Sequence, residues 1–375
     1  MSKVWYKKLD GKWALAVLVL SSLLLTACRK EANEQNNGQA APEFSVDILN
    51  KYTPIKNQGR GHLCWAYAML SAIETEHLMK GDSVNLSVAF VLRSLMEDIY
   101  PKYILTAGKA SLSDRATAQT LINLIQTYGI RPFDSYRGLP SHSFPDESNV
   151  ISSDVLLKKT ILIAQKALNA KAGLNEFKPQ FEQMLDESLG KPAEKVYMLG
   201  CEYSPQEFAR SVCRPDEYVA LTSFSHHPFF SNFTLEVPDN WEQNKFLNLP
   251  IDSLVSLLDS ALINNHGVCW EGDISEPGFS FKKGIALLKK PIPTGSDIQL
   301  IRQQLFERRR TTDDHCMAVV GIAHDQEGRK FYIMKNSWGS DNPYGGLIYM
   351  EDNYLKLKTI ALFLPKDVIK RNGNP

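Results

Sequence analysis

The sequence has no excess of charge of either sign. Its 375 residues include 42 lysines and arginines and 42 aspartates and glutamates, which gives a formal net charge of zero. A chain without a basic excess has no electrostatic attraction to a phosphate backbone, so nucleic acid is not an expected partner. Internal repeats are also missing, and 43% of the residues are hydrophobic. That proportion is sufficient for a full core in one large domain or two smaller ones.

The sequence also lacks a hydrophobic run long enough to be a confident transmembrane helix. The longest run, Trp13 to Leu25, is too short for this purpose and follows a lysine-rich start. Positive residues before a short apolar run are typical of a secretory signal peptide. The run ends in Leu25-Thr26-Ala27-Cys28, which is similar to a bacterial lipobox. The similarity implies cleavage before Cys28 and lipidation of its thiol; ordinary cleavage and an uncleaved anchor are the alternatives.

This N-terminal signal sets the expected domain organisation and location. Residues 1–27 are expected to be a lipoprotein signal peptide, and residues 28–43, rich in Asn, Gln and Glu, a solvated tether. Residues 44–375 then form the folded domain. Cleavage removes four lysines and one aspartate, so 38 basic and 41 acidic residues remain. We expect a protein anchored by lipid on Cys28 to a membrane of the bacterial cell envelope, either facing the periplasm or exposed at the surface.

Cysteine and histidine are too sparse to form a metal-binding pattern. The six cysteines include no CxxC pair, and the neighbouring His226 and His227 lack acidic or cysteine partners at ligand spacing. No metal or other cofactor is therefore expected. An exported protein could pair some of its cysteines, and Cys201 with Cys213 is the pair best suited by spacing. The cysteines left open for pairing are Cys201, Cys213, Cys269 and Cys316.

The stretch from Gln58 to Tyr67 is a polar, glycine-interrupted loop that runs into a helix with Cys64 at its beginning. No proline or glycine occurs from Cys64 to Lys80, and Gly81 then provides a helix end. The first turns are apolar on most sides, as expected for a helix buried in a core. A thiol at a helix N-terminus is favoured as the thiolate by the helix dipole and the free N–H groups. Cys64 is thus a candidate nucleophile, with a small buried hydrophobe as the alternative.

A partner for this thiol occurs near the other end of the chain. Residues 315–322 and 330–336 have the pattern of two strands separated by the polar turn 324–329, which predicts a β-hairpin. His315 and Asn336 are symmetric about this turn, so a simple hairpin places them opposite each other. An amide oxygen beside an imidazole fixes the tautomer of the ring. This is the third role in an arrangement of nucleophile, base and orienting group.

Four motifs together carry a resemblance to a known family. Gln58, Cys64-Trp65, His315 and Asn336-Ser337-Trp338-Gly339 occur in the order and spacing of the papain-like cysteine peptidases, which this chain resembles. The resemblance implies an α+β, two-lobed fold, in which a helical lobe carries the cysteine and a β-barrel-like lobe carries the histidine and asparagine. The site would lie in the cleft between the lobes.

The resemblance also implies a role for each matched residue. Cys64 would be the nucleophile, His315 the general base and then acid, and Asn336 the group that orients His315. Gln58 would stabilise the oxyanion together with the backbone N–H of Cys64. Trp338 would shield the hydrogen bond between His315 and Asn336 from water. The residues expected to support the site are Trp65 and Trp338.

Three stretches of the second half are similar to the bleomycin hydrolase/aminopeptidase C branch: Glu217 to Phe224, Lys245 to Pro250 and Val268 to Asp273. This similarity implies a helical insertion at about residues 140–215. Such an insertion helps subunits assemble in that branch, so a homo-oligomer is a further expectation. A C-terminal arm in that branch occupies part of the cleft and enforces aminopeptidase action. Only residues 365–375 follow the last expected strand here, which leaves exopeptidase and endopeptidase action both open.

Other polar residues have weaker cases for a role. Asp273 follows an expected strand in the half where papain-like enzymes build a specificity pocket, so it is a candidate for gripping a substrate amine; otherwise it is a turn residue. His62 is two residues from Cys64, a spacing poorly suited to a base. His324 lies in the expected turn, and the charge run Glu307 to Arg310 is typical of a solvated face.

The predicted function is hydrolysis of peptide bonds in peptide or protein substrates through a Cys–His–Asn triad and an acyl-enzyme, with an aminopeptidase as one form. Two alternatives use the same fold. A Cys–His enzyme could transfer the acyl group to an amine in place of water and so cross-link proteins. A surface-anchored binding protein could keep the fold without turnover.

Overall fold

A computed structural model describes residues 42–371 except residues 60, 140–151 and 199. The expected signal peptide, Cys28 and most of the expected tether lie outside the described residues. Residues Glu43–Pro375 form one compact unit. Within the described part of the chain, no helix is both long and apolar enough to cross a membrane.

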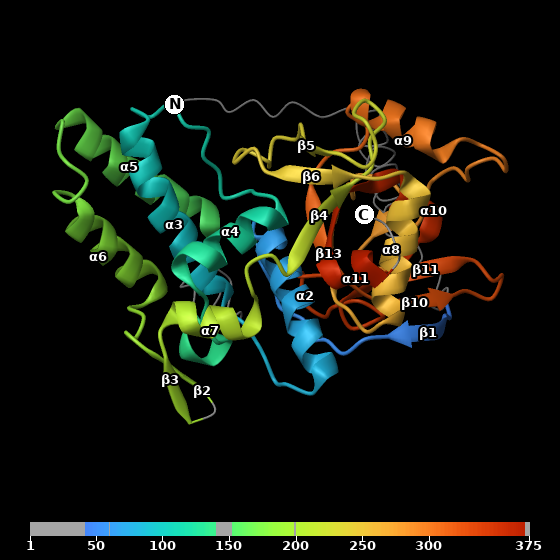
Figure 1. The fold of residues 1–375 in the computed structure, drawn as a ribbon, viewed down its shortest axis with the longest axis horizontal. Helices are drawn as coiled ribbons and strands as arrows, with labels where there is room; N and C mark the ends of the chain where they lie inside the picture. The colour runs from blue at the N-terminus through green and yellow to red at the C-terminus, as the bar shows by residue number, and fades with distance from the viewer. Residues whose placement is uncertain (1–41, 60, 140–151, 199, 372–375) are drawn as a thin grey trace, which may run out of the picture. The chain divides into compact units, whose positions relative to one another are not determined.

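A mixed β-sheet of 11 strands dominates the C-terminal half of this unit (Figure 1). Its strands are β1 (Ser45–Leu49), β4 (Tyr218–Thr222), β5 (Asn232–Thr234), β6 (Lys245–Asn248), β7 (Val268–Gly272), β8 (Phe279–Ser280), β9 (Ile285–Ala286), β10 (His315–His324), β11 (Lys330–Lys335), β12 (Leu347–Glu351) and β13 (Thr359–Pro365). Their order is β5-β6-β4-β13-β7-β10-β11-β12-β9-β8, and β1 pairs with β10. The central pairs β13–β7, β7–β10 and β10–β11 are antiparallel.

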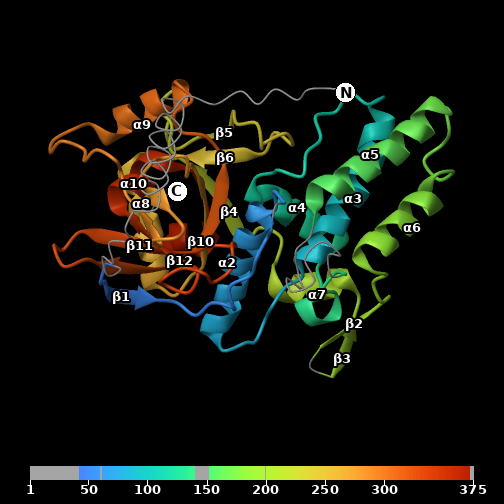
Figure 2. The ribbon, with the colours of Figure 1, turned by 180° about the vertical axis from the view of Figure 1, so that it is seen from behind.

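Helices from the first half of the chain gather on one side of the sheet, as both views of the ribbon show (Figures 1 and 2). They are α2 (Cys64–Lys80), α3 (Val88–Leu105), α4 (Ala118–Tyr128), α5 (Ser153–Asn169), α6 (Lys178–Leu189) and α7 (Pro205–Val212), with the short elements η1 (Phe133–Ser135), β2 (Val196–Met198) and β3 (Cys201–Tyr203). Helix α2 packs against β10 and β7 and also against α3 and α4. It therefore joins the helical part of the unit to the sheet.

The other face of the sheet is covered by the later helices α8 (Ile251–Ile263), α10 (Asp352–Lys358) and α11 (Lys366–Arg371). Helix α9 (Ile298–Glu307) packs against α10. Val368 of α11 is buried in the same core as the apolar residues of α8. The helical part with Cys64 and the sheet part with His315 and Asn336 confirm the expected α+β architecture.

Side chains of β7 and β10 alternate between two cores. On β7, Trp270 packs in the core that includes α8, whereas Cys269 packs in the core that includes α2. On β10, Met317 packs in the core that includes α8, and Cys316 packs in the core that includes α2. Because successive side chains of a strand point to opposite faces, Glu271 lies on the α2 face of β7.

Local signals mark several helix ends, and the helix end predicted at Gly81 is confirmed. Gly81 ends α2 in the left-handed conformation with φ of 95°. Ser87 caps α3, where its hydroxyl accepts a hydrogen bond from the N–H of Phe90 over 3.0 Å. Gly129 ends α4. Helices α5, α6 and α7 lie in the range of the expected helical insertion, about residues 140–215.

One expectation about the cysteines was wrong. Cys201 and Cys213 do not form a disulfide, and both are free thiols. The reason is their different surroundings, because Cys201 is exposed on β3 while Cys213 is buried among the helices.

Candidate active site

Cys64 is the first residue of α2, directly after the N-cap residue Leu63. Its N–H has no acceptor within the helix, and the positive end of the helix dipole lies at the sulfur. The thiol is partly exposed. These features give Cys64 the position that the sequence predicted for a nucleophile.

The pKa of Cys64 lies well below its ordinary value of 9.0, and the largest cause is a hydrogen bond from the thiol of Cys316. Burial opposes this effect, while a hydrogen bond and the positive charge of His315 add to it. Burial raises the pKa of Cys316 well above its ordinary value, so Cys316 stays protonated and can donate. Cys316 was missed in the sequence because neighbouring strand residues are expected to point to opposite faces, which argues against both His315 and Cys316 reaching one sulfur.

His315 is buried at the start of β10, with 3% of its surface exposed. Its Nε2 donates a hydrogen bond to Oδ1 of Asn336 over 2.8 Å, which leaves Nδ1 for the thiol. Burial lowers the pKa of His315, but the hydrogen bond and charge of Cys64 and the bond to Asn336 outweigh it and raise the pKa. A thiolate beside an imidazolium is therefore the favoured state of the pair.

His315 and Asn336 come together through a different register from the one predicted. The hairpin pairs Ala318 with Lys335 and, beyond an irregularity after Val319, Gly321 with Ile333. The symmetric prediction would have paired Ala318 with Ile333. The turn is therefore centred closer to β11, and Asn336 reaches His315 from just beyond the end of that strand.

Trp338 and Gln58 lie around this pair. The rings of Trp338 and His315 have centroids 4.7 Å apart, so the indole covers the imidazole. Gln58 is buried, and its side-chain oxygen accepts a hydrogen bond from the hydroxyl of Ser337. Its Nε2 donates one hydrogen to the carbonyl of Gly61 over 2.9 Å. The second hydrogen of that amide remains for a further acceptor.

His62 and Trp65 are both tied to Asp114. The Nδ1 of His62 lies 3.2 Å from a carboxylate oxygen of Asp114, which also accepts a hydrogen bond from the hydroxyl of Ser153 over 2.6 Å. The indole N–H of Trp65 donates to the backbone carbonyl of Asp114 over 3.0 Å. His62 is thus engaged by a carboxylate, and Trp65 fixes the first turn of α2 against the segment before α4.

Asp273 and His324 are occupied by contacts with the protein itself. The carboxylate of Asp273 is 1% exposed and accepts hydrogen bonds from the N–H groups of Ser275 (2.8 Å) and Thr312 (2.9 Å). It holds two loops together, so we do not carry Asp273 into the proposed site as a substrate ligand. His324 pairs with Asp47 of β1 at the exposed end of β10.

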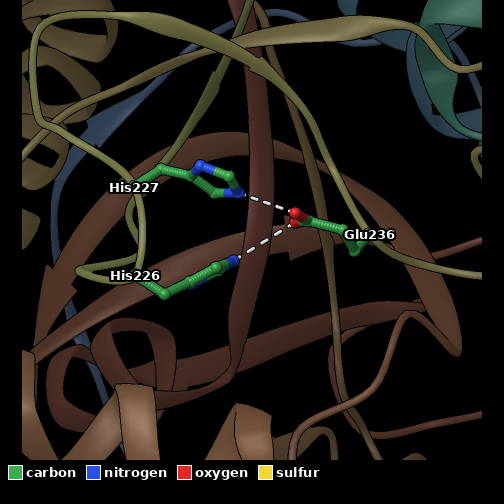
Figure 3. Close-up of side chains that lie close together, drawn as sticks. All are labelled: His226, His227 and Glu236. Carbon is green, nitrogen blue, oxygen red and sulfur yellow. Dashed lines mark hydrogen bonds and ion pairs between the residues drawn. The ribbon is translucent and has the colours of Figure 1, made fainter.

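His226 and His227 do have an acidic partner, contrary to the expectation from spacing. Glu236 faces both rings, and the ligand atoms of the three residues are within 4.8 Å of one another (Figure 3). The side-chain oxygen of Gln303 accepts from the N–H of Ser225, so its NH₂ group donates to Nδ1 of His226 over 3.0 Å. The proton of His226 is therefore on Nε2, which donates to Glu236 over 3.2 Å. In this structure the three residues form a hydrogen-bonded cluster.

Comparisons with known proteins show what this chain is similar to. A model of the Peptidase C1-like family matches residues 5–372. Aminopeptidase E of Lactobacillus helveticus is 22% identical over 374 residues, which cover 86% of this chain and 82% of that protein. Aminopeptidase W of Lactobacillus delbrueckii subsp. lactis is 21% identical over 389 residues, which cover 92% and 87%. The crystal structure of PepW from Lactobacillus rhamnosis HN001 matches with a TM-score of 0.67 at 19% identity, covering 98% of this chain and 96% of that one.

The match along nearly the whole chain defines the class of protein. The fold is that of the papain-like peptidases. The chain belongs to the Peptidase C1-like family and is a cysteine-type peptidase, a hydrolase.

Proposed function

We propose that this peptidase uses Cys64, His315 and Asn336 as a catalytic triad. The observation that carries the proposal is the 2.8 Å hydrogen bond between His315 and Asn336, beside a helix-terminal thiol whose pKa is held low. The thiolate of Cys64 attacks the carbonyl carbon of a peptide bond. The oxyanion that forms accepts hydrogen bonds from the backbone N–H of Cys64 and from the free amide hydrogen of Gln58.

The imidazolium of His315 then gives its proton to the leaving amine as the carbon–nitrogen bond breaks, and a thioester remains on Cys64. Water attacks the thioester carbonyl with His315 now acting as the base. The acid is released and the thiolate is restored. Asn336 keeps the Nε2–H tautomer through both steps, so Nδ1 is the nitrogen that exchanges the proton.

A thiol-directed epoxide inhibitor tests this proposal. It should label wild-type protein at Cys64 and should not label Cys64→Ala at that position. Turnover of a fluorogenic peptide amide should be lost in Cys64→Ala and in His315→Ala. Labelling without turnover of any peptide, or turnover that survives Cys64→Ala, would count against the triad.

We also propose that the enzyme can act as an aminopeptidase, because the relatives that it resembles are named aminopeptidases. Helix α11 packs with α8 on the sheet face away from α2, so this described part of the C-terminal segment does not occupy the site. Comparing free and N-acetylated peptides tests the specificity. Equal turnover of the acetylated peptide would exclude a strict aminopeptidase.

The location is a separate proposal that rests on the N-terminal sequence alone. We propose a lipid anchor on Cys28 that holds the peptidase in the cell envelope. Incorporation of an alkyne-tagged fatty acid should be lost in Cys28→Ser, with Cys213→Ser as the control. Incorporation that persists in Cys28→Ser would show that this cysteine is not the lipidation site.

A further inference from the structure

Glu271 is a buried carboxylate without a hydrogen-bond partner. Only 2% of its surface is exposed, and among the described residues neither carboxylate oxygen has a hydrogen-bond partner. Burying an unpaired charge is costly, so a side chain of this kind requires an explanation. Asp273, by contrast, is equally buried and accepts several hydrogen bonds. The surroundings of Glu271 therefore differ from those of Asp273, whose carboxylate holds two loops together.

The position of Glu271 is beside the catalytic sulfur. It lies opposite Cys316 in the register of β7 and β10, on the face of the sheet that α2 covers. Cys316 in turn contacts Cys64. The carboxylate also faces the N–H of Ala118 at the start of α4, and the hydroxyl of the preceding Thr117 is likewise buried without a partner. Two buried side chains that lack hydrogen-bond partners among the described residues thus lie where β7 meets the start of α4.

The charge around Glu271 is negative and is not neutralised by the nearby arginine. Burial raises the pKa of Glu271 well above the ordinary value, and the negative charges of Asp313, Asp239 and the Cys64 thiolate add to this effect. The side chain therefore keeps its proton when no cation is near, and a positive charge beside it favours the carboxylate. The guanidinium of Arg115 is committed elsewhere, because it binds the carboxylate of Asp239 over 3.0 Å and the carbonyl of Asp313 over 2.8 Å. No lysine, arginine or histidine of the described chain forms an ion pair with Glu271.

We propose that the carboxylate of Glu271 is a subsite for a positively charged group of the peptide substrate, bound beside Cys64. An ammonium group has three N–H donors and a guanidinium has five, enough to satisfy both carboxylate oxygens and a neighbouring hydroxyl. The cation is the α-ammonium of a free N-terminus or the side chain of a lysine or arginine. This inference rests on the proposed peptidase function and names the group that the site selects.

The test measures a selectivity ratio. Fluorogenic peptide amides are compared in pairs that differ by one charge, lysine against norleucine at each position and a free against an acetylated N-terminus. Wild-type enzyme should prefer the cationic member of at least one pair. In Glu271→Gln, which keeps the size and removes the group that can become a carboxylate, that ratio of kcat/KM should fall on the order of 10- to 100-fold. The pair that responds identifies the source of the cation.

Glu236→Gln serves as the matched control, because Glu236 is an exposed acid in a different cluster, and its ratio should stay at the wild-type value. A thermal unfolding midpoint near that of wild type shows that Glu271→Gln is folded. Labelling of Cys64 by an epoxide with a guanidinium tail, compared with the same epoxide with a butyl tail, measures the same preference without turnover. This preference for the guanidinium tail should be lost in Glu271→Gln as well.

Two results would overturn the subsite. One is a wild-type enzyme that cleaves cationic and neutral peptides equally, and the other is an undiminished ratio in Glu271→Gln. In both cases Cys64 would still be labelled and peptides would still be cleaved, so the peptidase proposal would stand. Absence of labelling and of all turnover in wild type would instead overturn both proposals.

Discussion

Cys316 lies beside Cys64, and a hydrogen bond from the Cys316 side chain to the sulfur is the largest influence that lowers the pKa of Cys64. The donor lies next to His315 in the chain, so two consecutive residues of β10 act on one sulfur. A hydrogen bond donated to a thiolate favours the charged form. The nucleophile is thus activated by a second cysteine as well as by the histidine.

Replacing Cys316 with alanine should therefore raise the pKa of Cys64. The sign follows because the lost hydrogen bond stabilised the thiolate and not the thiol. The acid limb of a plot of iodoacetamide alkylation rate against pH should move to higher pH in Cys316→Ala. Cys213→Ala, which removes a buried thiol at the end of α7, should leave the limb in place. A limb that does not move in Cys316→Ala would show that the contact does not tune the nucleophile.

The side-chain oxygen of Asn336 should be required for full activity, and the side-chain nitrogen should not be. Oδ1 accepts hydrogen bonds from His315 and from the N–H of Ser337, whereas Nδ2 is buried and has no partner among the described residues. Asn336→Ala should lower kcat roughly 10- to 100-fold through loss of the His315 tautomer, with a smaller change in KM. Asn336→Asp keeps an acceptor oxygen and should retain more activity than the alanine variant. Equal loss in both variants would contradict this role of the oxygen.

The sequence predicted local features well and long-range contacts poorly. The start of α2 at Cys64 and its end at Gly81 depend on residues within one or two turns, and both are present. The closeness of His315 and Asn336 also followed from one hairpin, although its register was wrong. The irregularity after Val319 shifts the pairing, and no glycine or proline pattern in the sequence marks its place.

The positions of Cys316 and Glu271 near Cys64 could not be predicted from local sequence patterns. Strand alternation argues against Cys316 and His315 acting on the same atom, so the position of Cys316 beside Cys64 is a result of tertiary packing. Glu271 is distinctive only because the start of α4 approaches β7, and the two elements are about 150 residues apart in the chain. Asp273, two residues further on, drew attention from its sequence context, yet its hydrogen bonds are satisfied by the protein.

The contact between α2 and the start of β7 should tolerate no added side chain at Gly267. A Cβ at this position would lie 2.3 Å from the carbonyl oxygen of Ala72 and 2.9 Å from Cβ of Thr75, both on α2. Gly267→Ala should therefore force the helix and strand apart and destabilise the fold by about 1–3 kcal/mol. Gly173→Ala is the matched control, because its Cβ meets only an ordinary contact at 3.5 Å. Urea unfolding of the two variants provides the comparison, and equal midpoints would contradict the predicted clash.

Asp313 should make the protein less stable as the pH rises. Burial and the charge of Asp239 raise its pKa to about 6 in the folded state, above the ordinary value of 3.8. The folded protein therefore holds this proton more tightly than the unfolded chain does, and stability falls as the pH rises from about 4 through 6. Asp313→Asn keeps an oxygen for the N–H of Asp239 and removes the buried charge. It should raise the free energy of unfolding at pH 8 by on the order of 1–3 kcal/mol and have little effect at pH 4.

Asp325 gives a control of opposite sign in the same experiment. Burial favours its neutral form, but hydrogen bonds from the N–H and guanidinium of Arg329 outweigh this and lower its pKa. The charged form therefore stabilises the fold above the ordinary pKa, and the benefit is lost as the pH falls through the lowered value. Asp325→Asn should lower the unfolding free energy at pH 8 and lose this effect in acid. Denaturant unfolding of both variants at pH 4, 6 and 8 tests the pair, and changes of the same sign at pH 8 would contradict the assignment of either carboxylate.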